Sequence, residues 1–112
     1  MLAVLAVALA LAGGAKTPHD AVLRFIENHS PADACAQLAP AYKKAIEASY
    51  GPCLAGMRVQ PKATRIVVSH EQIHGTKATV VASYHANGSN FRERYALART
   101  KGIWLITGSR QI

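Results

Sequence analysis

Two hydrophobic patterns divide the chain. Before residue 60, apolar side chains recur every three or four positions between clear helix boundaries, which is the period of amphipathic helices. After Gln60-Pro61, Val, Ile, Thr and Tyr dominate and the period falls toward two, which is typical of β-strands. The pattern therefore predicts helices in the first half of the chain and strands in the second.

One helix-start motif occurs twice. Thr17-Pro18-His19-Asp20 and Ser30-Pro31-Ala32-Asp33 each combine a capping hydroxyl, a proline at the first helical position and a carboxylate at the third. The hydroxyl satisfies a free N–H, the proline lacks an N–H that has no partner there, and the carboxylate favours the helix dipole. A third helix is expected from Pro40 to Gly51-Pro52, and a last helical turn from Cys53.

Four strands are predicted in the second half. Their connections are short and include the turn pair Asn87-Gly88, so neighbouring strands must form antiparallel hairpins. The expected ranges are Thr64 to Ile73, Lys77 to Ala86, Phe91 to Arg99, and Ile103 to Gly108. The predicted fold class is α+β, with N-terminal helices packed on one face of a curved four-stranded antiparallel sheet.

The first fifteen residues, MLAVLAVALALAGGA, carry no charge. The apolar run from Leu2 to Ala12 is shorter than the roughly 20 residues of a membrane span but suits the core of a secretory signal. Gly13 and Ala15 are small, as signal peptidase requires before a cut at Lys16. We expect residues 1–15 to be a cleaved signal peptide, an uncleaved anchor or a buried first helix, and residues 16–112 to form one exported domain in the periplasm, the cell envelope or outside the cell.

An exported chain meets an oxidising compartment, which changes the interpretation of the two cysteines. Cys35 and Cys53 are expected to form one disulfide, with free thiols as the alternative. Two cysteines without a CxxC or HxxxH pair do not make a metal site. His70 and His74 are four residues apart, but in a strand this spacing holds them too far apart for one metal ion. No metal or cofactor is predicted.

Charge is concentrated in the predicted sheet. The chain has 112 residues, 50% of them hydrophobic, and a formal net charge of +7, which fits one globular domain and excludes a wholly disordered protein. Residues 60–112 hold eight Lys and Arg against two Glu. We expect either a solvated face or a patch for an anionic envelope polymer or lipid. Its predicted members are Arg92, Arg94, Lys77 and Arg99. Nucleic acid is not an expected partner, because the aromatic residues occupy positions compatible with a core.

Several segments together resemble one family. A hydrophobic export signal, T-P-x-x-A-V-x-x-F-I, D-A-C-A-Q-L-A-P-A, G-P-C-L-A, K-A-T-V-V and K-G-I-W-L-I are similar to small exported bacterial proteins of the nuclear transport factor 2-like (SnoaL-like, cystatin-like) superfamily. The resemblance implies helices over a curved sheet that leaves a conical pocket, and dimerisation through the outer sheet face. The last strand, apolar on both faces, also favours a homodimer.

Strand alternation selects the candidate chemistry. Phe91, Glu93 and Tyr95 share one face of their strand, and Tyr84 on the preceding strand can face the same interior. A carboxylate among apolar neighbours is how an enzyme prepares a general acid or base, whereas Glu93 paired with an arginine or at an open rim is the structural alternative. The candidate catalytic residues are Glu93, Tyr95, Tyr84 and His70. The candidate ligand-pocket residues are Phe25, Tyr84, Phe91 and Trp104.

Three functions follow from these residues. The leading hypothesis is a non-enzymatic exported domain that binds a small apolar or amphipathic ligand, or a partner in the envelope. The second is a SnoaL-like enzyme for proton transfer, with Glu93 as base and Tyr95, Tyr84 or His70 polarising a carbonyl. The third is a cationic module that docks on anionic envelope polymers.

Overall fold

Helices precede a single antiparallel sheet, as the sequence predicts. The computed structural model describes residues 13–112. Leu2 to Ala12, the predicted core of the export signal, lie outside the described residues. The elements are α2 (Pro18–Glu27), α3 (Pro31–Ala36), α4 (Pro40–Tyr50), α5 (Cys53–Val59), β1 (Thr64–His74), β2 (Lys77–Ala86), β3 (Ser89–Thr100) and β4 (Ile103–Gln111). The α+β fold class is confirmed, and β2 has the predicted bounds.

The predicted caps form. The Thr17 hydroxyl accepts the main-chain N–H of Asp20 at 3.0 Å, and the Ser30 hydroxyl accepts that of Asp33 at 3.3 Å. Asn28 ends α2 in the left-handed conformation, with φ of 48°. These local contacts fix where the first two helices begin and where the first one stops.

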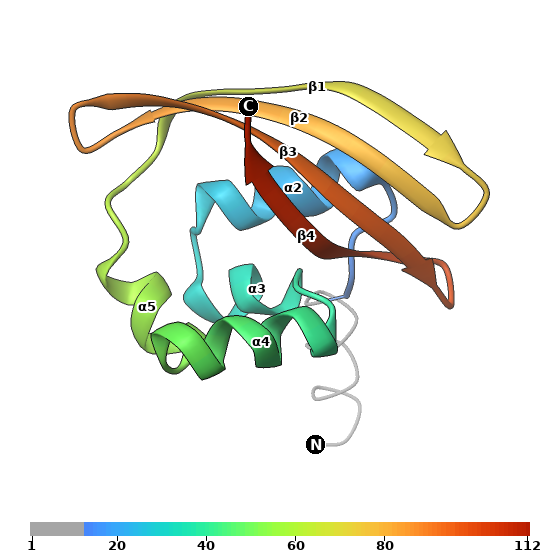
Figure 1. Cartoon of the computed structure of the whole chain (residues 1–112), viewed down its shortest axis with the longest axis horizontal. Helices are drawn as coiled ribbons and strands as arrows, with labels where there is room; N and C mark the ends of the chain where they lie inside the picture. The colour runs from blue at the N-terminus through green and yellow to red at the C-terminus, as the bar shows by residue number, and fades with distance from the viewer. Residues whose placement is uncertain (1–12) are drawn as a thin grey trace, which may run out of the picture.

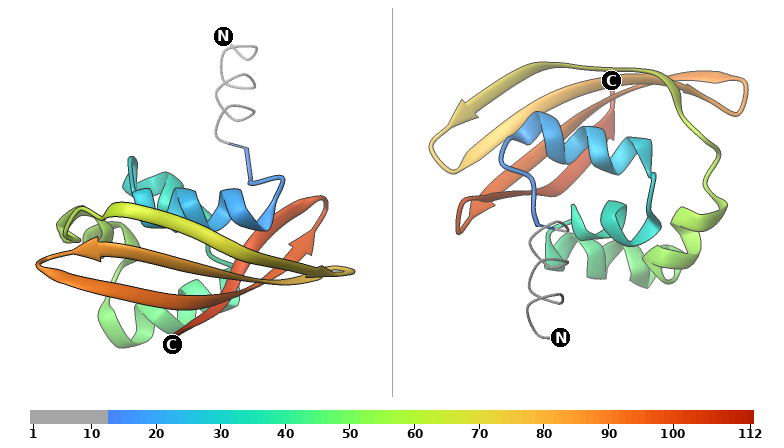
Figure 2. Two further views of the ribbon diagram at one scale, coloured as in Figure 1. Left: turned by 90° about the horizontal axis from the view of Figure 1, so that it is seen from above. Right: turned by 180° about the vertical axis from the view of Figure 1, so that it is seen from behind.

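The sheet order is β1-β2-β3-β4, with antiparallel pairing throughout. The pairing of β2 with β3 is continuous from Lys77–Ala98 to Ala86–Ser89, whereas the pairings on either side contain register shifts. Figure 1 shows the sheet along one side of the molecule, with α2 directly beneath it and the other helices farther from it. The views from above and behind in Figure 2 agree that the helices lie on one face, called the inner face.

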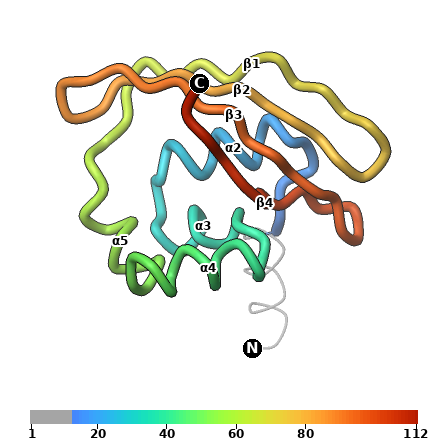
Figure 3. The backbone as a smooth tube through the Cα atoms, in the orientation of Figure 1, coloured from blue at the N-terminus to red at the C-terminus, as the bar shows by residue number. Residues whose placement is uncertain are grey.

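The core lies between α2 and the inner face. Ala21 and Val22 of α2 pack with Val80, Leu97 and Ile106 of three strands, and all five side chains are buried. The tube in Figure 3 shows β1 and β2 extending together beyond the helices. The tip of this hairpin is correspondingly exposed, so the helices cover the sheet unevenly.

The disulfide joins two of the helices. Cys35 of α3 and Cys53 of α5 are bonded, with their Cα atoms 6.1 Å apart, and both side chains are buried. The bond closes the chain around α4, which has no buried residue of its own. The predicted disulfide is confirmed, and it attaches a largely exposed helix to the body of the domain.

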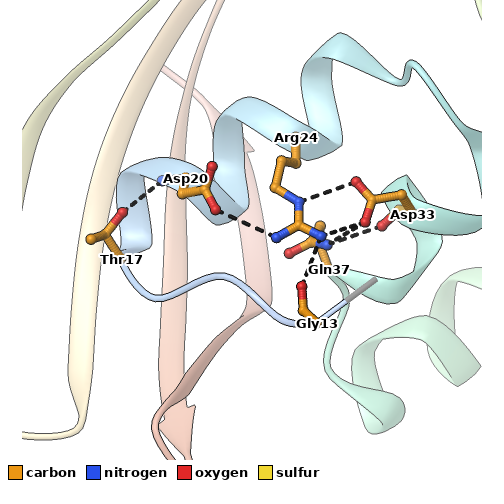
Figure 4. A network of polar contacts seen from close by, with 6 residues as sticks. All are labelled: Gly13, Thr17, Asp20, Arg24, Asp33 and Gln37. Atoms are coloured by element: carbon orange, nitrogen blue, oxygen red, sulfur yellow. Dashed lines mark hydrogen bonds and ion pairs between the residues drawn. The ribbon is translucent and has the colours of Figure 1, made fainter. Parts of the chain in front are cut away.

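Residues 13–15 pack into the domain. Ala15 is fully buried, and its carbonyl oxygen accepts the main-chain N–H of Trp104 at 3.0 Å. Arg24 donates to the Gly13 carbonyl oxygen at 3.0 Å and also binds Asp33 and Asp20, a network drawn in Figure 4. A cut at the predicted position before Lys16 would therefore remove main-chain partners of β4 and of Arg24.

Candidate functional site

A cavity of about 490 Å³ opens between the helices and one end of the sheet. Its helical side, from α2, α5 and the segment before β1, is mostly apolar but includes Asn28 and Gln60, and its other side comes from β2, β3 and β4. Its lining residues include Phe25, Ile26, Asn28, Met57, Tyr84, Phe91, Glu93 and Tyr95. The helices and the inner face thus enclose a pocket that is mostly apolar on one side and carries a carboxylate on the other.

Glu93 is held by two tyrosines. The Tyr84 hydroxyl donates to Glu93 Oε1 at 2.9 Å, and the Tyr95 hydroxyl donates to the same oxygen at 2.7 Å. Tyr84 lies one strand away and Tyr95 two positions along the same strand, so the inner-face alternation brings all three together. Within residues 13–112, the hydrogen bonds leave Oε2 without a protein donor, and no ion pair involves Glu93.

Both tyrosines remain donors. Burial, followed by the hydrogen bond to the Glu93 carboxylate and its charge, raises the pKa of Tyr84 and of Tyr95 well above the ordinary value for tyrosine. Tyr95 is 2% exposed. Each hydroxyl therefore keeps its proton at ordinary pH and is already committed to Glu93, which limits its ability to donate elsewhere.

Aromatic contacts fix the tyrosine rings. Tyr84 stacks on Phe91 with ring centroids 5.4 Å apart, and Phe25 meets Tyr95 edge to face at 6.3 Å. Such pairs favour one ring orientation over others. Phe25, Tyr84 and Phe91 line the cavity, and their role in ligand binding stays a prediction.

Asn28 is a lining residue that the sequence analysis missed. Its Nδ2 donates to the Met57 carbonyl oxygen at 2.6 Å, which ties the end of α2 to α5. Its Oδ1 is buried and lacks a partner among the described residues. A sequence signal existed, since Asn is common where a helix ends in the left-handed conformation.

Trp104 does not line the cavity. It is 2% exposed and lies beneath the segment at Ala15, with the Arg99 guanidinium 5.5 Å from the centre of its ring. The expectation that Trp104 faces the ligand pocket is wrong, because Trp104 lies at the start of β4 beside Ala15, whereas β4 lines the cavity near its other end with Ser109 and Gln111.

His70 is also separate from the cavity. It is exposed on β1 with φ of 53°, within a register shift between Ser69 and Gln72, and its Nδ1 lies 2.9 Å from the Ser69 hydroxyl. The bulge interrupts the alternation from which its position was judged. The structure therefore does not bring His70 together with Glu93.

The basic residues divide between the two faces. Arg92 and Arg94 are exposed on the outer face, and the register places Lys77 on the same face through its pairing with Ala98. Arg99 pairs with Trp104 and so lies on the inner face, near the end of β3. The expected patch therefore holds three of its four predicted members on one face.

Residues 13–112 contain no group of three or more His, Cys, Asp or Glu side chains arranged to hold a metal ion. No helix in this part of the chain has both the length and the apolar character needed to cross a membrane.

Comparison with known proteins supports the fold alone. No protein-family model matches the chain, and no curated protein sequence matches it. The solution structure of a SEC-C motif containing protein from Rhodopseudomonas palustris is similar, with a TM-score of 0.67, 15% identity, and coverage of 93% of this chain and 85% of that one. The resemblance to the nuclear transport factor 2-like superfamily was wrong, because its anchors were caps and strand patterns that report an α+β arrangement rather than a family.

Proposed function

We propose that this protein is a non-enzymatic binding domain for a small amphipathic molecule with an apolar body and a cationic, hydrogen-donating end. The observation that carries the proposal is the Glu93 carboxylate in the wall of a cavity that also has apolar lining residues, with Tyr84 and Tyr95 both bonded to one of its oxygens. A primary ammonium group is the simplest chemistry that completes this arrangement.

The charge of Glu93 sets the kind of ligand. As a carboxylate, Glu93 only accepts hydrogen bonds, and one of its oxygens already accepts from both tyrosine hydroxyls. Its Oε2 lacks a protein donor among residues 13–112, so a ligand N–H can bond to it directly. An anionic ligand end would instead meet a like charge in a partly desolvated pocket.

The apolar wall sets the rest of the ligand. Phe25, Ile26 and Met57 face the cavity from the helical side, and a volume of about 490 Å³ falls in the range of about 300–1,000 Å³ that is common for small-molecule sites. A short alkyl chain or a single ring beyond the ammonium group suits these dimensions.

The same contacts disfavour the proton-transfer alternative. A tyrosine that polarises a substrate carbonyl must donate its hydroxyl hydrogen, but both hydroxyls already donate to Glu93. Breaking either bond would leave a partly buried carboxylate with one donor fewer. Ligand binding without chemistry requires no such exchange.

We propose that the domain works after export. The uncharged, apolar segment at residues 1–15 and the disulfide Cys35–Cys53 support an oxidising compartment. A homodimer through the outer face remains a second proposal, favoured by the exposed Val67 and Ile112 and opposed by the arginines between them.

The test uses Glu93→Gln and a matched control. Octylammonium is titrated calorimetrically into the wild type, into Glu93→Gln, and into Glu27→Gln, which removes one negative charge from a helix residue that does not line the cavity. The glutamine oxygen still accepts from both tyrosines, so the fold is preserved. We expect Glu93→Gln to weaken binding by about tenfold or more and Glu27→Gln to leave it nearly unchanged. Equal affinities in all three proteins would refute the proposal.

A further inference from the structure

A second hollow, of about 360 Å³, lies where β1 enters the sheet beside the β2–β3 hairpin. Its lining residues are Arg65, Ser83, Tyr84, His85, Asn90, Phe91, Arg92 and Ile112. No acidic side chain is among them, in contrast to the cavity around Glu93. Two guanidinium groups therefore share one concave surface without a carboxylate side chain in its wall.

The sheet places these residues for a structural reason. Ser83 pairs with Arg92 and His85 with Asn90, so these four residues lie on the outer face of β2 and β3. Arg65 sits in a register shift of β1 between Thr64 and Val67, with φ of 54°. A bulge of this kind redirects one side chain out of the regular alternation, and here it adds Arg65 to the hollow.

The positive charge of this hollow is not balanced internally. The salt bridges of residues 13–112 pair neither Arg65 nor Arg92 with any carboxylate, the main-chain carboxylate at Ile112 included. Arg94, two positions along β3 from Arg92, and its partner Arg110 on β4 continue the basic surface. Unpaired, clustered guanidinium groups repel one another, and an anion between them relieves this repulsion.

Polar donors complete the site. His85 Nδ1 lies 2.9 Å from Asn90 Oδ1, and since this oxygen only accepts, the bond leaves the Asn90 amide nitrogen available as a donor. The Ser83 hydroxyl offers a further donor from the same wall. Guanidinium, amide and hydroxyl donors from three strands thus face one space.

We infer that this hollow binds a phosphate group. One arginine fork satisfies a planar carboxylate, whereas two arginines with extra donors match a tetrahedral oxyanion that accepts from several directions. Tyr84 and Phe91 line both this hollow and the cavity around Glu93, but the inference rests on Arg65 and Arg92, which line the hollow alone. The phosphate can belong to a soluble phosphoester or to a lipid headgroup, which share this chemistry.

The test titrates the full domain with inorganic phosphate and follows main-chain amide resonances by NMR at constant ionic strength, with chloride as the reference anion. The variants are Arg65→Gln and Arg92→Gln, separately and together, with Arg58→Gln on α5 as the matched loss of an exposed arginine. We expect saturable shifts at residues 65, 83–85 and 90–92, about tenfold weaker binding in each single variant and none in the double variant. Arg58→Gln should bind phosphate like the wild type.

Identical shifts with phosphate and chloride, or unchanged phosphate binding in the double variant, would overturn the inference. Phosphatidylcholine vesicles with and without phosphatidic acid identify the source. Binding to phosphatidic acid that is lost in the double variant supports the site and assigns a headgroup. Binding of free phosphate alone supports the site and assigns a soluble phosphoester, whereas vesicle binding that survives both substitutions contradicts it.

Discussion

Removing residues 13–15 should destabilise the domain measurably. The comparison is between chains that begin at Gly13 and at Lys16, the second being the product of the predicted signal cleavage. The shorter chain loses the bond from Trp104 N–H to the Ala15 carbonyl oxygen, the bond from Arg24 to Gly13, and the complete burial of Ala15. Gly14 also lies so close to Ile103 that an added Cβ would clash with that side chain.

The magnitude follows from these contacts. A neutral hydrogen bond contributes about 1 kcal/mol, one from a guanidinium about 2, and a buried methyl group about 0.8. The conformational entropy lost when three residues are ordered opposes this stabilisation by about 1 kcal/mol per residue, which is the lower end of the usual range. The net loss is about 1 kcal/mol, which lowers the melting temperature of a domain of this size by roughly 4–8 °C.

The assay is thermal unfolding followed by fluorescence. Trp104 is the single tryptophan of the chain, and Ala15 pairs with it, so its emission reports directly on this segment. The shorter chain should melt earlier and emit at longer wavelength, because water gains access to the indole ring. Equal melting temperatures and equal emission maxima would show that residues 13–15 contribute nothing to the domain.

Two further predictions concern the tyrosines and the disulfide. Because burial and Glu93 raise the pKa of Tyr84 and Tyr95, the folded state keeps protons that the unfolded state loses above about pH 10. The unfolding free energy should thus be insensitive to these groups below about pH 10 and should fall above that pH by up to about 1.4 kcal/mol per pH unit for each tyrosine. The slope should be smaller in Tyr95→Phe. Urea unfolding at a series of pH values measures the slope, and an equal slope in Tyr95→Phe and wild type would count against the prediction. Replacing Cys35 and Cys53 together by serine should lower the unfolding free energy by about 3 kcal/mol, and no change in the urea midpoint would contradict this.

The helix starts could be predicted from the sequence because they depend on contacts between residues that are close together in the chain. A hydroxyl, a proline and a carboxylate at Thr17 and Ser30 determine a helix start within four residues. Strand alternation likewise placed Tyr84, Glu93 and Tyr95 on one face, because the pairing of β2 with β3 has no register shift. The convergence on Glu93 was therefore predictable, whereas its catalytic role stays a prediction.

The features that were missed depend on contacts across the chain. Trp104 is covered by Ala15, 89 positions earlier in the sequence, and no local pattern gives that pairing. The bulges at Arg65 and His70 shift β1 against its neighbour and reverse the side-chain order that a period of two implies. Non-glycine residues with positive φ carry only a weak sequence signal, so the second hollow was not foreseeable either.

The most direct test of the ammonium site compares two ligands of equal length. Octylammonium and octanoate are titrated into the wild-type protein under the same conditions. The net charge of +7 attracts octanoate in general, so a preference for octylammonium must come from a local carboxylate. The account predicts about tenfold tighter binding of octylammonium. Equal affinity, or tighter binding of octanoate, would contradict the assignment of Glu93 as the ligand-binding carboxylate.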